Sequence, residues 1–157
     1  MQLQQIGVIH TPYKSVREMP VQPAGSAGAV GSIELNPELA AGLKDLGGFS
    51  HILVIYGFHR VAGSRLTVTP FLDQTPHGVF ATRAPTRPNP LGLSLLQLVR
   101  IAGTTLQVAG IDMLDGTPLF DIKPYVPAFD HHFPERVGWL EETGRDARNH
   151  RSDDRFC

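Results

Sequence analysis

Short apolar segments rich in β-branched residues recur along the chain, and this recurrence restricts the possible fold more than any other feature. Seven such segments, separated by glycine, proline and aspartate, are predicted to be strands: 3–12, 29–35, 51–58, 64–71, 78–82, 92–101 and 104–113. The segment 51–58 is almost continuously apolar, which is typical of a strand covered on both faces. Seven closely spaced strands favour a β-sandwich or barrel over an alternating βαβ fold.

Helical signals are confined to two segments. Asn36 is a suitable N-cap and Pro37 fits the first position of a helix. The apolar residues that follow fall at i, i+4 and i+7 and form one stripe: Leu39, Leu43 and Leu46. The segment 135–144 is a candidate for a second, short helix. The fold class predicted from the residues is therefore mainly β, with one or two short helices.

Composition and length bound the class of protein. The chain has 157 residues, 41% of them hydrophobic, which suits one globular domain; we expect it over 1–143, with a polar, flexible tail over 144–157. A net charge of −1 argues against a generally basic protein that coats nucleic acid. The single cysteine, Cys157, excludes a disulfide or a thiolate zinc site within one chain. No signal-peptide pattern or membrane-length apolar run is present, so we expect a cytoplasmic protein.

Three prolines stiffen the loop 82–92, which lies between two predicted strands. Proline fixes its own φ and restricts the residue before it, so this loop has little entropy left to lose when a ligand binds. Arg83 and Arg87 provide guanidinium groups suited to a carboxylate, a phosphate or a stacked base. Asn89, before a proline, could orient an exocyclic amine toward an electrophilic methyl group. An irregular connection with solvated arginines is the alternative.

Two further clusters have both a structural and a functional interpretation. Asp115 and Gly116 are a strong hairpin-turn signal, but the carboxylates around them could also hold ribose hydroxyls or an amine. His59 and Arg60 close a buried strand, where a histidine usually belongs to the rim of the core. His131 and His132 are adjacent and would point to opposite faces of an extended chain, so we expect no metal site.

Five blocks in this order resemble the signature blocks of the TsaA-like family, the TrmO family of S-adenosylmethionine-dependent tRNA methyltransferases. They read IGVIHTPYK, VQPAG, FSHILVIYGFHR, GVFATRAPTRPNPLGLSLLQL and GIDMLDGTPLFDIKPYVPAFD. The resemblance extends from about residue 4 to 130. It implies a single small β-barrel, a homodimer with the cofactor near the subunit interface, and N6-methylation of threonylcarbamoyl-modified adenosine next to the anticodon of tRNA.

The resemblance also implies which residues contact S-adenosylmethionine. Matched block by block, they are Gln22, Pro23, Ala24, His59, Arg60, Arg83, Leu93, Asp115, Gly116, Thr117 and Pro118. Arg87 and Asn89 are then left to face the substrate, and we expect them to act in catalysis, with Asn89 orienting the amine that is methylated. The expected partners are tRNA and a second copy of the chain, with no membrane and no metal.

Three other hypotheses stay open from the sequence. The barrel could bind S-adenosylmethionine as a sensor without transferring a methyl group, or it could methylate a different small amine. A hydrolase that needs no cofactor would require an acid–base pair, such as His59 with Asp112 or Asp121, in one pocket. Family members that continue beyond the barrel carry a further region, so how a chain with a short tail selects tRNA is also open.

Overall fold

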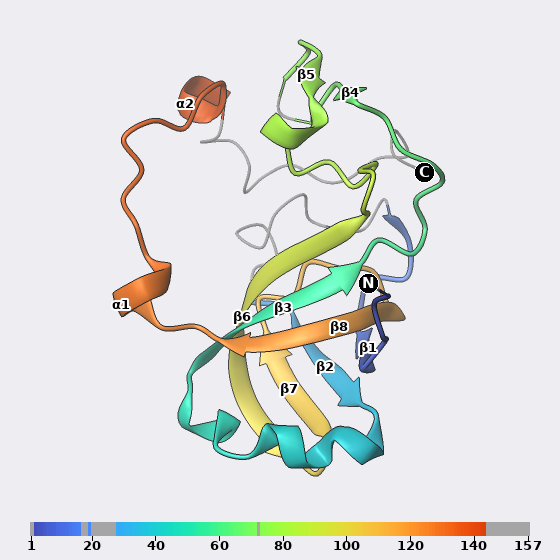
Figure 1. The fold of residues 1–157 in the computed structure, drawn as a ribbon, viewed down its shortest axis with the longest axis vertical. Helices are drawn as coiled ribbons and strands as arrows, with labels where there is room; N and C mark the ends of the chain where they lie inside the picture. The colour runs from blue at the N-terminus through green and yellow to red at the C-terminus, as the bar shows by residue number, and fades with distance from the viewer. Residues whose placement is uncertain (1, 17–18, 20–27, 72, 144–157) are drawn as a thin grey trace.

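The computed structural model describes residues 2–16, 19, 28–71 and 73–143 of the chain, and its centre is a closed barrel (Figure 1). Six antiparallel strands close it in the order β1-β2-β7-β6-β3-β8. Their bounds are β1 Gly7–His10, β2 Val30–Leu35, β3 His51–Gly57, β6 Leu91–Ala102, β7 Thr105–Ala109 and β8 Thr117–Pro124. The predicted β-barrel is therefore confirmed, with six strands in the barrel itself.

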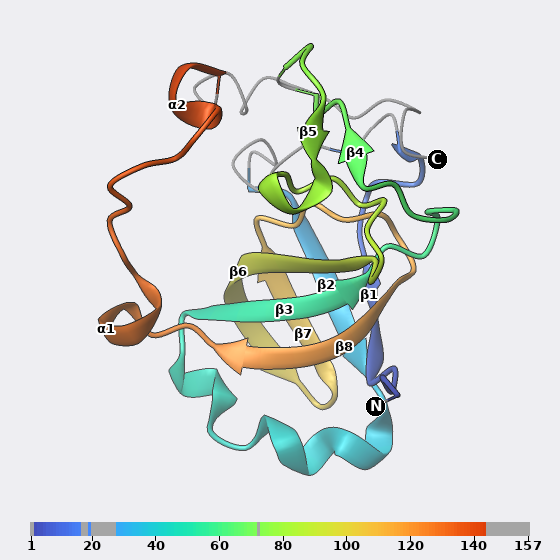
Figure 2. The same ribbon diagram turned by 45° about the horizontal axis from the view of Figure 1, so that its top comes forward.

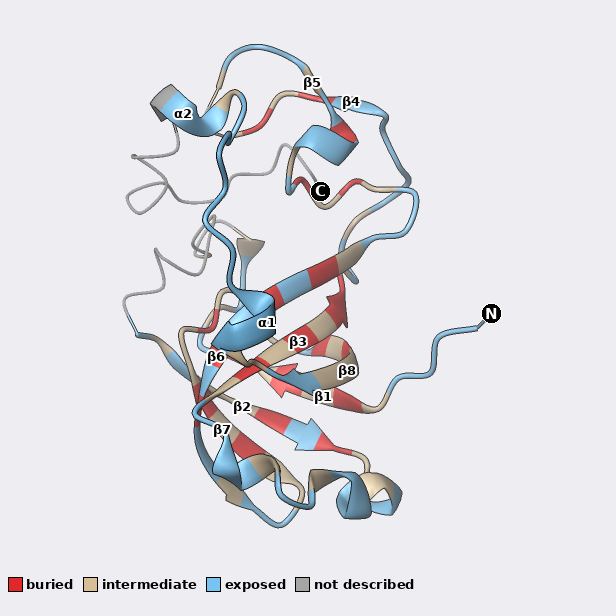
Figure 3. Ribbon diagram, turned by 60° about the vertical axis from the view of Figure 1, so that its left-hand side comes forward, coloured by how far each residue is buried: buried red, intermediate tan, exposed pale blue. Residues whose placement is uncertain are grey.

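Alternation along the strands fills the interior of the barrel. In β6 the buried positions are Gly92, Ser94, Leu96 and Leu98, while the residues between them face outward. The core that results includes these fully buried side chains: Ile9, Ile33, Ile52, Val54, Leu96, Leu106, Val108, Ile111 and Leu119. Figure 3 shows the buried positions concentrated on the barrel strands, whereas α1 is exposed. The outer residues of β3 are half-buried, which agrees with its continuous apolar sequence.

A second, small unit lies above one end of the barrel (Figure 2). It holds a two-stranded sheet of β4 (Thr67–Val68) and β5 (His77–Gly78), followed by the 3₁₀ helix η5 (Val79–Ala81). Its own apolar cluster consists of Val68, Val79 and Ala84, with Phe71 packed against it. The strands predicted over 64–71 and 78–82 are therefore wrong in extent, because a turn and a 3₁₀ helix replace most of both.

The predicted helix after β2 is present as two 3₁₀ helices, η3 (Pro37–Leu43) and η4 (Leu46–Gly48), which lie at the other end of the barrel. The apolar stripe behaves as expected, since all three leucines pack against the core. Asn36 is the N-cap residue of η3 and Pro37 begins it, as predicted, but the Asn36 side chain makes no capping hydrogen bond. Its amide donates instead to the Gln5 carbonyl at 3.1 Å. Two short α-helices complete the described chain, α1 (Pro127–Asp130) and α2 (Leu140–Thr143).

The hairpin predicted at Asp115 and Gly116 is also wrong. β7 lies between β2 and β6, whereas β8 lies between β3 and β1, so the chain crosses the barrel end between them. Gly116 has a φ of 77°, which suits the turn that enters β8. Asp115 fastens this turn to the end of β1, because its carboxylate accepts the Thr11 amide at 2.9 Å and pairs with Lys14 at 2.7 Å.

Candidate ligand site at the end of the barrel

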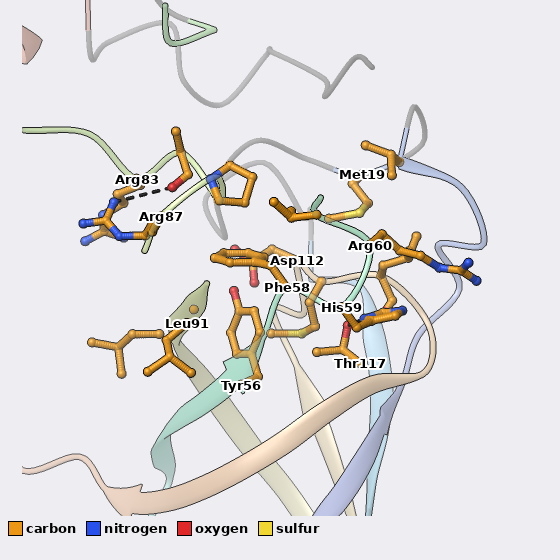
Figure 4. A pocket seen from close by; sticks show the side chains of 18 of the residues that line it. Met19, Tyr56, Phe58, His59, Arg60, Arg83, Arg87, Leu91, Asp112 and Thr117 are labelled. Carbon is orange, nitrogen blue, oxygen red and sulfur yellow. Dashed lines mark hydrogen bonds between the residues drawn. The ribbon is translucent and has the colours of Figure 1, made fainter. Parts of the chain in front are cut away.

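A cavity of about 390 Å³ opens where β3 ends and β6 and β8 begin. Antiparallel pairing explains the position, since the end of β3 and the start of its two neighbours lie at the same rim. Its walls come from the residues after β3, from the proline-rich loop and from the segment before β8 (Figure 4). Its size falls within the range of sites that hold one small molecule or cofactor.

The phenol ring of Tyr56 forms part of the cavity wall and lies over Gly92. The two residues are directly opposite each other in the β3–β6 pair. A methyl group on Gly92 would overlap the Tyr56 ring. Glycine is therefore required here to let the ring lie flat against β6. The ring of Phe58 meets that of Tyr56 edge to face, with centroids 5.5 Å apart.

A chain of hydrogen bonds runs along the wall from Tyr56 through Ser94 to Asp112. The Ser94 hydroxyl donates to the Asp112 carboxylate at 2.8 Å, and the Tyr56 hydroxyl lies 3.2 Å from the Ser94 oxygen. Since Ser94 has a single proton and gives it to Asp112, Tyr56 is the donor of the second bond. Ser94 is an inward polar residue of the barrel, with 3% of its surface exposed.

Burial controls the ionisation of this chain. Desolvation raises the pKa of Asp112 to about 6, although the Ser94 hydrogen bond and Arg83 both oppose the shift. Burial and the nearby Asp112 charge raise the pKa of Tyr56, so its hydroxyl stays protonated and able to donate. The cavity thus holds one carboxyl group that can change its charge near neutral pH.

Basic side chains lie at two ends of the cavity (Figure 4). Arg83 and Arg87 are at one end, and His59 and Arg60 are at the other. Partial burial and the neighbouring Arg60 charge lower the pKa of His59, so this ring is mostly neutral at pH 7. The Nδ1 atom of His59 lies 3.5 Å from the Thr117 hydroxyl. Anionic groups of a ligand would therefore be favoured at either end.

Arg87 holds its own loop together. Its Nη1 atom donates to the carbonyls of Val79 at 3.0 Å, Thr82 at 2.9 Å and Ala84 at 3.5 Å. The loop is also tied to the strand end below, because the Phe58 amide donates to the Pro90 carbonyl at 2.8 Å. The stiffness expected from the prolines is thus reinforced by a guanidinium group that faces backbone oxygens.

The structure brings some of the predicted site residues together and leaves others outside the cavity. Those that line it are His59, Arg60, Arg83, Arg87, Leu93 and Thr117. Asp115, Gly116 and Pro118 are not part of its wall. Gln22, Pro23 and Ala24 lie outside the described residues, as does the segment 144–157. The roles of all these residues in cofactor binding or catalysis stay predictions.

Asn89 is exposed on the loop just before β6 and is not part of the cavity wall. Its backbone carbonyl accepts the Leu91 amide at 2.7 Å. Within the described part of the chain, no hydrogen bond joins the Asn89 side chain to another residue. If Asn89 orients the amine that is methylated, it must therefore do so at the rim of the cavity and not inside it.

Sequence reasoning did not select Tyr56 or Ser94, and it considered Asp112 only as a possible acid–base partner of His59. Tyr56 and Ser94 were hidden inside apolar strand segments, and Asp112 was one of several carboxylates near the turn. One sequence signal could have identified Tyr56 and Ser94. Gly92 and Ser94, at alternate inward positions of β6, leave room for a large side chain from the neighbouring strand β3. Of the two acid–base pairs that the sequence suggested, His59 and Asp112 both line the cavity. Asp121 does not line it and pairs with Lys123 at 2.8 Å.

Two classes of site find no support in the described part of the chain. No group of three histidine, cysteine, aspartate or glutamate residues there is placed to hold a metal ion. None of the described helices is long and apolar enough to span a membrane.

The fold and the cavity define a small β-barrel with a candidate ligand site at its rim, and comparisons with known proteins assign its family. Residues 8–131 match the model of the tRNA-methyltransferase O N-terminal domain, so the chain belongs to the TrmO N-terminal domain family. A crystal structure of TrmO superposes with a TM-score of 0.74 at 37% identity, covering 88% of this chain and 63% of that one. The family resemblance is confirmed.

Two curated relatives have names that state a ligand or an activity. A probable S-adenosyl-L-methionine-binding protein of Pyrococcus abyssi is 48% identical over 151 residues, which are 96% of this chain and 82% of that protein. The tRNA (adenine(37)-N6)-methyltransferase of Escherichia coli K12 is 39% identical over 136 residues, which are 80% of this chain. The chain spans 58% of the length of the Escherichia coli protein.

Proposed function

We propose that this chain is an S-adenosylmethionine-dependent tRNA (adenine-N6)-methyltransferase whose reaction takes place at the rim cavity. The single observation that carries the proposal is the family match over residues 8–131, which includes the elements that build the cavity. The names of relatives in Escherichia coli and Eikenella corrodens support the same activity.

The residues of the cavity fit S-adenosylmethionine in volume and in chemistry. The cofactor has an adenine ring, ribose hydroxyls, a carboxylate, an ammonium group and a sulfonium centre. Apolar side chains such as Phe58 and Met113 suit the adenine, Arg83 or Arg60 suits the carboxylate, and Asp112 suits a hydroxyl or a cation. When bound, the cofactor supplies an electrophilic methyl group.

The chain contributes position and electrostatics. The fixed loop and the Tyr56–Ser94–Asp112 chain hold polar groups in place before a ligand arrives, so little order is lost on binding. The proton on the target nitrogen becomes acidic as the methyl group is transferred, so a weak base or water suffices to remove it. Asn89 at the rim, with a loop carbonyl, orients that nitrogen.

The finer proposal concerns the substrate: threonylcarbamoyl-modified adenosine next to the anticodon. The threonyl group of this nucleoside has a carboxylate that ordinary adenosine lacks. Cations at both ends of the cavity support the proposal, because one end can take the carboxylate of the cofactor and the other the carboxylate of the substrate.

A homodimer in the cytoplasm is part of the same proposal. Leu93 lines the cavity and is 58% exposed, and Leu95 and Val99 are exposed on the same outer face of β6. A second copy that covered this face would also close the side of the cavity at Leu93. Sedimentation equilibrium should then give twice the mass of one chain.

A second candidate function is cofactor binding without methyl transfer. The observation that favours it is the name of the Pyrococcus abyssi relative and of an Archaeoglobus fulgidus relative, both S-adenosyl-L-methionine-binding proteins. In this case the cofactor would bind tightly and no acceptor in tRNA would be methylated.

The test uses purified protein, S-adenosylmethionine labelled in its methyl group and tRNA from cells that lack the adenosine methylation. Matched tRNA that also lacks the threonylcarbamoyl group is the control. Label in the first tRNA alone supports the whole proposal, and label in both refutes the threonylcarbamoyl requirement. Calorimetric binding of the cofactor without label in either tRNA favours the second candidate.

A further inference from the structure

Phe80 is a large apolar side chain exposed beside the cavity. It is the middle residue of η5, and 76% of its surface is accessible. A single exposed apolar residue is common on protein surfaces and proves nothing by itself. Phe80 differs from such a residue in two respects: its backbone is held in place, and arginines lie beside its ring.

The turn that carries Phe80 is held on both sides. The preceding residue, Val79, has its side chain fully buried in the small apolar cluster. The Val79 carbonyl accepts the Thr82 hydroxyl at 2.9 Å and Arg87 Nη1 at 3.0 Å. On the other side, the indole of Trp139 donates to the Ala81 carbonyl at 2.8 Å. The ring therefore projects from a backbone that cannot easily move to bury it.

A cation connects this ring to the cavity. The guanidinium carbon of Arg87 lies 5.8 Å from the centre of the Phe80 ring, and Arg87 also lines the cavity. Arg83, four residues before Arg87, lines the same end. The carboxylate of Asp73, in the loop before β5, pairs with Nε2 of His77 at 2.8 Å. The surroundings of Phe80 thus combine a flat apolar face with positive charge.

We infer that Phe80 is a stacking platform for an unpaired RNA base next to the adenosine that enters the cavity. The inference rests on the proposed function, since it assumes an RNA substrate. Aromatic rings accept any base by stacking, and nearby arginines favour the phosphates that connect the bases. A second copy of this chain could also cover Phe80, but RNA places a phosphate beside every base, which suits a ring with adjacent arginines.

The first experiment measures affinity for tRNA by fluorescence anisotropy in wild-type protein and in Phe80→Ala, Phe80→Trp and Phe133→Ala. Phe133 is the matched control because its ring is 89% exposed but lies in the segment between α1 and α2. We expect Phe80→Ala to bind tRNA about tenfold more weakly, as expected for one lost stack, and Phe80→Trp and Phe133→Ala to bind as wild type does. Affinity for S-adenosylmethionine should stay constant in all four.

The second experiment locates the contact. An anticodon stem–loop RNA with 5-iodouridine beside the target adenosine is irradiated with each protein, and the crosslinked peptide is mapped. A crosslink at Phe80 that is lost in Phe80→Ala supports the inference. Equal losses of affinity in Phe80→Ala and Phe133→Ala, or a change of oligomeric state in Phe80→Ala alone, would overturn it. Failure of the wild-type protein to bind or methylate tRNA would instead refute the proposed function.

Discussion

At the scale of single residues, Arg87 and Asp112 show how little a residue type reveals about its role. Both are charged side chains beside a cavity. Arg87 directs its Nη1 atom to three backbone carbonyls, while Asp112 is held by Ser94 in surroundings that favour its neutral form. One supports the loop, and the other can respond to pH.

Replacing Arg87 with lysine should destabilise the protein by about 2 kcal/mol. Lysine keeps the charge but cannot present a planar fork to several carbonyls, and hydrogen bonds that involve a charged group are worth about 1.5–3 kcal/mol. Urea unfolding measures the loss. Arg65→Lys is the control, because Arg65 is exposed and its backbone amide makes the contact to Thr86. Unchanged stability together with lost methylation would instead indicate that Arg87 acts on the substrate.

Replacing Asp112 with asparagine should change how stability depends on pH. The pKa of about 6 in the folded protein lies above the ordinary value for an aspartate, so ionisation between about pH 4 and pH 7 lowers wild-type stability. Asparagine stays neutral. The stability of Asp112→Asn relative to wild type should therefore rise over this range by on the order of 2 kcal/mol. Thermal unfolding at several pH values tests this, and a constant difference would contradict it.

At the scale of elements, the site depends on how β3 and β6 face each other. Tyr56 from β3 occupies the space that the missing side chain of Gly92 leaves in β6, and the next inward residue of β6, Ser94, meets the hydroxyl of the same ring. The register of this one strand pair thus places the ring and its hydrogen-bond partner together.

Replacing Gly92 with alanine should displace the Tyr56 ring and cost about 1–3 kcal/mol, the usual range for overpacking. Affinity for S-adenosylmethionine should fall with it, as measured by calorimetry, because the ring forms part of the cavity wall. Gly78→Ala is the control: Gly78 has a φ of −59°, and a methyl group there would meet nothing within 4 Å. Equal effects of the two substitutions would exclude the proposed clash.

Elements with regular alternation could be predicted from the sequence, and those without it could not. The apolar pattern located β1, β2, β3, β6 and β7. β8 (Thr117–Pro124) was missed, because two prolines, Asp121 and Lys123 disguise it and because the Asp115 turn resembles a hairpin. The stiff loop was anticipated from its prolines, but the carbonyls that Arg87 would contact could not be, since they depend on how the loop folds. Tyr56 and Ser94 lie within blocks that resemble the family, but neither was assigned a role, because both stand inside apolar strand segments.

At the scale of the whole molecule, the segment after the barrel returns to the small unit near the cavity. Trp139 stacks on His77, with ring centres 4.6 Å apart, and donates a hydrogen bond to the Ala81 carbonyl. Trp139 lies beyond the residues that match the family model, which end at 131. Residues 131–138, which precede Trp139, are all exposed. The contacts of Trp139 are therefore the main ones that hold this segment against the small unit.

Trp139 is the only tryptophan in the chain, so its fluorescence should report release of this segment separately from unfolding of the barrel. We expect the fluorescence transition in urea to precede the circular-dichroism transition, because the indole is held by one stack and few hydrogen bonds. His77→Ala should shift the fluorescence midpoint to lower urea and leave the other midpoint unchanged. Coincident transitions in both proteins would show that the segment and the barrel unfold as one unit.

The turn between β6 and β7, where Gly103 has a φ of 60°, lies at the end of the barrel away from the small unit that holds Phe80 (Figure 1). It contributes no residue to the cavity wall. A fluorophore or a surface tether attached to this turn would therefore leave the rim open to solution. Single molecules immobilised there would present the ligand site to a large nucleic acid without obstruction, which makes this turn the natural point of attachment for watching individual binding events.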